Sequence, residues 1–495
     1  MILLKNVIIS NVYWIGSVIM LNCKRLKRMI LINYFLFVLG VLLSLLGLTD
    51  CTIVINIIAS ILLLQVVKNI TNSYINFSMF FTFFHVLYGL SGVISKAWFN
   101  QLSSTYGTVF RYCPYLLAFS LCSLFLLSGM LVAYKKNYKS SGANNALNVK
   151  YKNYFMFVSY VGFALTTIFE LVNFFRVGGV PTLLAGKAIY QARVDELFLT
   201  LPTQQIFQVS LAAFCVYLYI IYGNNLKITL KQIMIPIFLA LPYMLIIIIL
   251  GRRGPLLVVF LLLVITYFMI KPLKKISFKI VGVTFIVYVF LGIVFAVRND
   301  IKLLFTDFQG FTEKVNVNYI LKNLNPALNE FGCTYGNFNK FYVVNDYQLL
   351  YGKSYIYGLS HIVPTYIYSG DKPRLITYEF RDKYFPDKSK ISSIASTGFS
   401  SILETYWNFW YFGAVIYFIY GYLIITLENK IKFKSCFSLL YYLSLTTTTY
   451  SFHRSDFGHF SSEIIFLLLE VLCIRYFYHM VYSKVKSIDK FIEKI

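Results

Sequence analysis

Continuous apolar runs of membrane-crossing length recur along almost the whole chain, and they limit its fold more than any other feature. A helix needs about 20 apolar residues to cross the hydrocarbon core of a bilayer, and runs close to this length recur from Met29 to Val481. Because a backbone in lipid must satisfy its own hydrogen bonds, each run is expected to be an α-helix. A transmembrane β-barrel would need short segments of alternating polarity instead, and the sequence lacks that pattern.

The number of runs predicts a polytopic membrane protein. Hydrophobic residues make up 58% of the chain and charged residues only 13%, whereas soluble proteins are nearer a quarter charged. We predict an all-α fold of about 12 transmembrane helices, near residues 30–48, 51–67, 73–95, 113–134, 154–175, 206–223, 233–251, 255–270, 280–297, 406–426, 435–451 and 461–482. A run at 3–22 is either a thirteenth span or an interfacial helix, and the sequence leaves both open.

Positive charge is concentrated in the short breaks between the runs. The formal net charge of +25 could indicate a nucleic-acid-binding protein. However, Lys and Arg gather in small groups at 24–28, 271–279, 430–434 and 484–494. Such groups are typical of cytoplasmic loops. The distribution therefore argues against nucleic acid as a partner and predicts a cytoplasmic C-terminus.

Under this topology three connections face the outer compartment: residues 176–205, the tight link 251–255 and the long segment 298–405. The long segment divides the chain into N-terminal membrane helices (1–297), the extracytoplasmic segment itself, and a C-terminal part (406–495) of three helices and a cytoplasmic tail. Loops beyond about 15 residues usually carry structure or function, so 298–405 is predicted to form a small lid.

Local patterns within the long segment predict its parts. Residues 307–324 and 375–384 are expected to form short amphipathic helices. Turns are expected at Tyr351-Gly352, at Tyr357-Gly358 and over 369–373. No cofactor or metal is expected, since the chain holds no nucleotide-binding glycine loop, no CxxC, no Cys/His cluster and no DxD.

Two adjacent arginines, Arg252 and Arg253, occupy the tight link between two apolar runs. Guanidinium groups suit bidentate contact with phosphate oxygens. Their stems can alternatively lie in lipid with the charged heads among headgroups. Arginines are normally depleted on the outer side, which favours phosphate binding. Arg176 and Arg193 belong to segment 176–205 and face the same compartment, so they are candidates for binding substrate.

A second cluster closes the long segment, from Gly398 to Gly413. Glu404 and Asn408 are four residues apart and so share one face of a helix. Glu404 can act as a base towards a sugar hydroxyl, hold an arginine such as Arg374 or Arg381, or be a first-turn acid favoured by the helix dipole. The aromatic residues around it, Tyr406 included, fit an interfacial belt first and sugar stacking second.

Several further polar residues have both a functional and a structural interpretation. His361 and Arg374 lie in a polar, turn-rich stretch upstream of Glu404 and are candidates for binding substrate. His453, Arg454 and Asp456 form a short outer connection that is either solvated or lines a pocket. Ionisable residues within spans, such as Glu170, are functional hypotheses by default or boundary groups.

Together these features resemble one family. Arg252-Arg253 between two helices, the long late segment and the pattern G-x-S-x-x-x-E-x-Y-x-N-F from Gly398 to Phe409 are similar to the Wzy-type O-antigen and capsular polysaccharide repeat-unit polymerases. One difference is that Trp410 stands where that family often has glycine, with Gly413 following.

The resemblance implies a membrane glycosyltransferase of type C-like architecture in the bacterial cytoplasmic (inner) membrane, with its active site outside. It would transfer a growing chain from undecaprenyl pyrophosphate to the nonreducing-end hydroxyl of an incoming lipid-linked oligosaccharide. Arg252 and Arg253 would stabilise the leaving pyrophosphate, and Glu404 would complete the catalytic set. Substrate would be bound by Arg176, Arg193, His361, Arg374, Tyr406 and Asn408. The implied partners are that oligosaccharide, membrane lipids, a chain-length regulator and a flippase.

Two other functions stay open. An O-antigen ligase would share the arginines and the long segment, although the pattern from Glu404 to Phe409 favours a polymerase. A flippase for lipid-linked oligosaccharides would need charged groups lining a central cavity through many spans, and such charge is sparse here.

Overall fold

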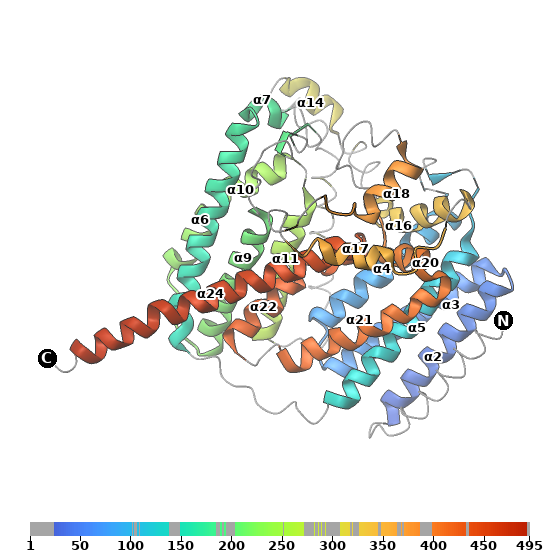
Figure 1. Cartoon of the computed structure of the whole chain (residues 1–495), viewed down its shortest axis with the longest axis horizontal. Coiled ribbons are helices and arrows are strands. Elements are labelled where there is room, and N and C mark those ends of the chain that lie inside the picture. The colour runs from blue at the N-terminus through green and yellow to red at the C-terminus, as the bar shows by residue number, and fades with distance from the viewer. Residues whose placement is uncertain are drawn as a thin grey trace.

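The computed structural model describes residues 24–492 with gaps. Of residues 272–306, it describes only 282, 286, 289 and 293. The other gaps are 101, 103–105, 108, 138–148, 185–188, 191–192, 195–202, 251, 317–318, 320–325, 345–347, 364–367, 369–370, 387–397 and 432–434. The elements of this part are helices, with no strand among the described residues (Figure 1). The predicted all-α, polytopic fold class is confirmed.

Nine helical stretches of the described residues are long and apolar enough to cross a membrane. They comprise α2 (Lys24–Leu45), α3 (Thr49–Thr71), α4 (Phe77–Ala97), α5 (Tyr112–Asn137), α6 (Lys152–Arg176), α9 (Thr203–Gly223), α10 (Leu230–Ile249), the run that begins with α20 (Ser401–Phe409), and α24 (Phe457–Ile492). Helix α11 (Arg253–Ile270) is apolar but shorter. The predicted run at 3–22 and all but four residues of the run at 280–297 lie outside the described residues, so the expected total of about 12 spans is still a prediction.

The predicted span at 435–451 is not one continuous helix, which corrects the sequence prediction. Helix α22 (Cys436–Thr446) is followed after a turn by α23 (Thr449–Phe452). The hydroxyls of Thr447, Thr448 and Thr449 each donate to a carbonyl three residues earlier. Such bonds compete with the regular backbone ladder and bend helices. The run of threonines therefore accounts for the break.

The predicted span at 406–426 begins earlier than expected and is also divided. Helix α20 starts at Ser401, whose neighbour Ser400 accepts a hydrogen bond from Leu403 N–H as the N-cap. The 3₁₀ helix η4 (Trp410–Ala414), α21 (Val415–Thr426) and the π-helical η5 (Leu427–Ile431) follow. Glu404 thus lies within a helix of this run.

Residues 298–405 contribute α14 (Phe308–Lys314), α16 (Pro326–Val344), α17 (Lys353–Ser360) and α18 (Ile376–Tyr384). Helix α18 and the turn at Tyr351-Gly352 confirm the predictions, since both turn residues have positive φ. The turn predicted at Tyr357-Gly358 is wrong, because both residues belong to α17. A Cβ on Gly358 would lie 2.9 Å from the Cα of Gly458, so this glycine permits close approach of α17 and α24.

Helix α16, which the sequence patterns did not predict, belongs to the same core as the membrane helices. Tyr335 and Phe338 are fully buried and pack against Tyr115 of α5. The hydroxyl of Thr334 donates to the backbone oxygen of Tyr88 in α4. In Figure 1, α16, α17, α18 and α20 gather at one end of α4, α5 and α21. This arrangement gives the segment before α20 a fixed place against the bundle.

Candidate active site

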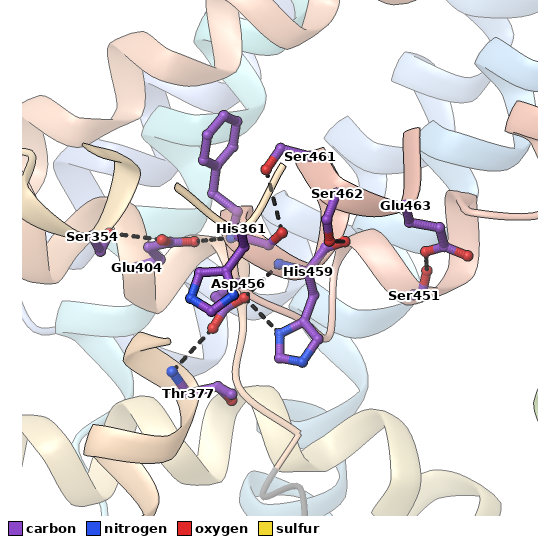
Figure 2. A network of polar contacts seen from close by, with 12 residues as sticks. Ser354, His361, Thr377, Glu404, Ser451, Asp456, His459, Ser461, Ser462 and Glu463 are labelled. Atoms are coloured by element: carbon purple, nitrogen blue, oxygen red, sulfur yellow. Dashed lines mark hydrogen bonds and ion pairs between the residues drawn. The ribbon is translucent and has the colours of Figure 1, made fainter. Parts of the chain in front are cut away.

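Glu404 joins three helices through its two carboxylate oxygens. Its Oε1 accepts a hydrogen bond from the hydroxyl of Ser354 in α17, at 2.7 Å. Its Oε2 accepts one from the backbone N–H of Phe457, the first residue of α24, also at 2.7 Å. The residue is only 2% exposed, and Figure 2 shows its hydrogen bond to Ser354. The base interpretation of Glu404 therefore requires an intermediary between the carboxylate and any substrate.

Glu404 and Asn408, predicted to share one helix face, belong to the same hydrogen-bond network. The side-chain amide of Asn408 donates to Ser354 Oγ at 2.7 Å and to the backbone oxygen of Glu404 at 2.8 Å. Its Oδ1 accepts from Gly352 N–H at 3.0 Å. Asn408 is fully buried. The amide thus fixes both the turn before α17 and the hydroxyl that faces Glu404.

Asp456, which precedes α24, is a second buried carboxylate beside Glu404. Its Oδ1 accepts hydrogen bonds from the backbone N–H and from Nδ1 of His459, and its Oδ2 accepts one from Thr377 N–H in α18 (Figure 2). Burial acts to raise the pKa of Asp456, but the hydrogen bonds and charge of His459 outweigh burial and lower that pKa below its usual value. The carboxylate caps α24 and ties α18 to it.

Sequence reasoning had left Asp456 open between a solvated group and a pocket residue. The structure shows it 1% exposed, in the connection that also holds His453. An aspartate just before the last apolar run is a recognisable N-cap signal. This pattern predicts that Asp456 caps the helix, but it does not predict that Asp456 lies near Glu404.

The hydroxyl of Ser354 also borders a small pocket between α17 and α18. The pocket is partly open to solvent, and Lys353, Tyr357, Arg374 and Glu379 contribute to its lining. Arg374 is 51% exposed and forms an ion pair with Asp382. His361 Nε2 lies 2.7 Å from the backbone oxygen of Pro373. Glu404, Asn408, His361 and Arg374, all predicted site residues, are thus brought to one region.

The two arginines considered as partners of Glu404, Arg374 and Arg381, both pair with Asp382 instead. Arg381 is almost fully buried and pairs with Asp382 at 2.6 Å. Tyr406 is 1% exposed and packs on Phe338, with ring centroids 4.8 Å apart. The structure therefore places Tyr406 in the core that supports α20, away from an exposed sugar-binding surface.

Arg252 belongs to a second cluster. It directly precedes α11, and its guanidinium carbon lies 6.0 Å from the ring centroid of Tyr190. The hydroxyl of Tyr190 donates to Glu170 Oε1 at 3.2 Å, and that of Thr203 donates to Glu170 Oε2 at 3.1 Å. Glu170 is 3% exposed. Sequence reasoning treated Glu170 and Arg252 separately, since they are far apart in the chain.

The remaining predicted arginines differ in their surroundings. Arg253 is the first residue of α11, but its side chain lies outside the described residues. Arg176 is exposed at the end of α6. Arg193 Nη1 donates to Val177 O at 3.0 Å and to Thr182 Oγ1 at 3.1 Å. Arg193 therefore holds the turn leading into α7 (Gly179–Leu184).

Glu404 and the start of α11, which follows Arg252, both contact residues 450–457. A Cβ on Gly254, two residues after Arg252, would lie 2.2 Å from the hydroxyl of Tyr450, so α11 meets α23 there. Glu404 meets the same segment at Phe457. A possible metal site made of three or more His, Cys, Asp or Glu residues does not occur in the part of the chain that the structure describes.

A family model described as O-antigen polysaccharide polymerase Wzy matches residues 26–485 of the chain. The matched range contains both clusters. No match is found among curated proteins or among solved structures.

Proposed function

Because the chain belongs to the O-antigen polysaccharide polymerase Wzy family, we propose that it joins oligosaccharide repeat units carried on undecaprenyl pyrophosphate. The product is a surface polysaccharide, either O-antigen or capsule, made at the outer face of the bacterial cytoplasmic (inner) membrane. The match over residues 26–485 carries this proposal. The contact of residues 450–457 with Glu404 and with the start of α11, which follows Arg252, supports it, since donor and acceptor must meet.

The reaction needs no redox step and no external reactant. An acceptor hydroxyl attacks the anomeric carbon of the donor chain, and the bond from that carbon to the carrier pyrophosphate breaks. The hydroxyl proton passes to a base, and the pyrophosphate leaves with its negative charge. Arg252 and Arg253 stabilise this charge. The half-buried Arg252 lies beside Tyr190 and the buried Glu170, a setting that holds its cation in place.

The cluster around Glu404 acts on the acceptor. Glu404 receives the proton of the attacking hydroxyl, while Asn408 fixes the local geometry. Arg374 lies in the adjacent pocket, and His361 holds the chain beside it. Arg176 adds exposed positive charge for the anionic donor. A flippase that delivers the units and a regulator of chain length are the expected partner proteins.

Deletion of the gene tests the proposed function. In a deletion strain, surface glycan is expected to shrink to single repeat units, as read from a length profile on a gel. Complementation with the wild-type gene should restore long chains, whereas Arg252→Ala should not. Arg252→Lys should rescue poorly, because an ammonium cannot make the forked contact.

Other outcomes of the deletion would support the two competing functions. Long chains that accumulate on the carrier without transfer to the lipid core would identify a ligase. Single units that accumulate on the cytoplasmic side would identify a flippase. Normal glycan length in the strain that carries Arg252→Ala would remove this arginine from the site.

A further inference from the structure

We infer that the pocket between α17 and α18 binds the terminal sugar of the acceptor unit, with the hydroxyl of Ser354 standing between that sugar and Glu404. This inference rests on the proposed function and names the substrate group that one of its clusters takes.

The position of Ser354 is the first observation. This side chain lines the pocket and donates to Glu404 Oε1, so it is the contact between the pocket and the buried carboxylate. The amide of Asn408 donates to the same hydroxyl oxygen. Two fixed partners therefore set the direction of the Ser354 hydroxyl. A hydroxyl in the pocket meets Ser354 first and Glu404 only through it.

The charges around the pocket fit a polyhydroxylated sugar better than a phosphate. Lys353 and Arg374 supply positive charge, and Glu379 supplies a carboxylate between them. Burial raises the pKa of Glu379, while the charges of Lys353 and Arg374 act to lower it. The cation of Arg374 is also paired with Asp382. Because acidic groups offset the cations, a pyrophosphate gains little here, whereas sugar hydroxyls can donate to Glu379 and accept from Lys353.

The protein offers an aromatic wall for the apolar face of a sugar ring. Tyr357 lines the pocket, and Lys353 Nζ lies 5.1 Å from its ring centroid. Binding pockets commonly combine apolar or aromatic walls with a few placed polar groups. The side chains of Lys353 and Glu379 are exposed, so they can adjust around a ring.

The proton path then has two linked transfers. The acceptor hydroxyl gives its proton to Ser354 Oγ as Oγ gives its own proton to Glu404 Oε1. At the same time the acceptor oxygen bonds to the anomeric carbon, and the carrier pyrophosphate leaves with the electron pair of the broken bond. Glu404 afterwards releases the proton to solvent by the reverse route through Ser354, which restores both groups.

Competition with two probes tests the pocket on purified full-length protein supplied with lipid-linked repeat units. The first probe is the free oligosaccharide unit, with its carrier removed. The second probe is inorganic pyrophosphate. In Lys353→Met and Glu379→Gln, the concentration of oligosaccharide needed for half-inhibition should rise about 10-fold, equivalent to about 1.4 kcal/mol. Inhibition by pyrophosphate should not change.

Matched substitutions outside the pocket control for the loss of charge. Lys314→Met and Glu313→Gln alter exposed residues of α14 and should leave both inhibition constants at wild-type values. Pocket variants with unchanged oligosaccharide inhibition would overturn the inference. Loss of pyrophosphate inhibition in these variants would also overturn it, because the pocket would then bind the carrier.

Direct binding separates the inference from the proposed function. The affinity of the free oligosaccharide for the protein is measured by calorimetry, which does not require turnover. A wild-type protein that binds the sugar through Lys353 and Glu379 but joins no units would overturn the proposed function alone. A protein that joins units while its pocket variants bind sugar normally would overturn the pocket alone.

The role of Ser354 has its own pair of variants. Ser354→Ala should lower the rate at saturating acceptor about 100-fold, whereas Ser354→Thr keeps a hydroxyl and should recover most of it. Thermal unfolding is compared for both, since the alanine also removes one of the hydrogen-bond acceptors of the Asn408 amide. Equal rates for the alanine and threonine variants, at equal unfolding temperatures, would contradict the transfer through Ser354.

Discussion

At the scale of single residues, the behaviour of the site depends on how the oxygens of Glu404 are occupied. One oxygen accepts from a hydroxyl and the other from a backbone N–H. A glutamine has one acceptor oxygen and one donor NH₂, so it cannot accept both bonds. Substitution of Glu404 by glutamine therefore removes the proposed base and leaves a buried donor unmatched at the same time.

We expect Glu404→Gln to slow polymerisation by about 100-fold or more, because general-base assistance typically contributes that much. The free energy of unfolding should fall by about 1–3 kcal/mol, since a buried donor loses its acceptor. A polymerisation assay at saturating acceptor measures the first effect, and thermal unfolding measures the second. Glu313→Gln on α14 should change neither. A near-normal rate with reduced stability would leave Glu404 a capping role only.

The backbone at Trp410 has a conformation that suits glycine better than tryptophan. Its φ of 56° and ψ of −146° fall close to a region that only glycine populates readily. The ring is 44% exposed, so the side chain contributes limited burial. A glycine between α20 and η4 would adopt these backbone angles without strain.

We expect Trp410→Gly to keep or raise stability. Relief of strain is about 1–3 kcal/mol, and the entropic cost of glycine is about 0.5–1 kcal/mol. Thermal unfolding in detergent measures the net change. Trp407→Gly is the matched control, because Trp407 is 6% exposed within α20 and donates to Gln348 O. Its loss should cost at least about 3 kcal/mol. Equal destabilisation by the two changes would contradict the strain argument.

At the scale of elements, the geometry of the site depends on how closely α17 approaches α24. Gly358 faces Gly458 with no side chain on either. This contact brings Ser354 of α17 and Phe457 of α24 within reach of one carboxylate. The spacing between two helices thus determines whether Glu404 can hold both partners.

Gly358→Ala is expected to reduce polymerisation at least about 10-fold while the protein still inserts into the membrane. The added methyl meets backbone rather than a movable side-chain end, so α17 must shift and overpacking typically costs about 1–3 kcal/mol. Glycan length and membrane protein level are measured together. Gly223→Ala is the control, because nothing lies within 4 Å of its added Cβ. Wild-type glycan length in Gly358→Ala would show that the approach of the two helices is not needed.

Helices could be predicted from the sequence where their formation depends only on residues that are close together in the chain. Runs of apolar residues predicted α2 to α6 and α24, because lipid requires each segment to satisfy its own backbone. Helix α16 was missed because its burial depends on Tyr115 and Tyr88, which are distant in sequence. The spacing of Glu404 and Asn408 was likewise local, whereas Ser354 and Asp456 join them only through tertiary packing.

At the scale of the whole molecule, the basic groups between the helices predict which ends face the cytoplasm. Lys135 is exposed at the end of α5, and Lys314 is exposed at the end of α14. The positive-inside rule places the first inside and the second outside. In Figure 1, α14 lies at the top of the molecule and the C-terminal end of α24 at its left edge.

Single cysteines test this orientation in a background without the eight native ones. In intact spheroplasts, a maleimide that cannot cross membranes should label Lys314→Cys and spare Lys135→Cys. After lysis both should react, which controls for access. The reverse pattern would turn the predicted topology over and move the pocket to the cytoplasmic side.

The pocket beside Ser354 contacts only the terminal sugar of the acceptor, and this has a consequence for the product. If the growing chain is the donor, then the molecule that enters the pocket is a fresh unit in every round. Its outermost sugar is the same whether the chain holds two units or two hundred. The acceptor pocket therefore does not sense how many units have been added, and the probability of a further addition is the same in every round. If this pocket alone controlled the product, the number of chains would decrease geometrically with chain length. A preferred length therefore requires a factor that senses the length of the donor chain.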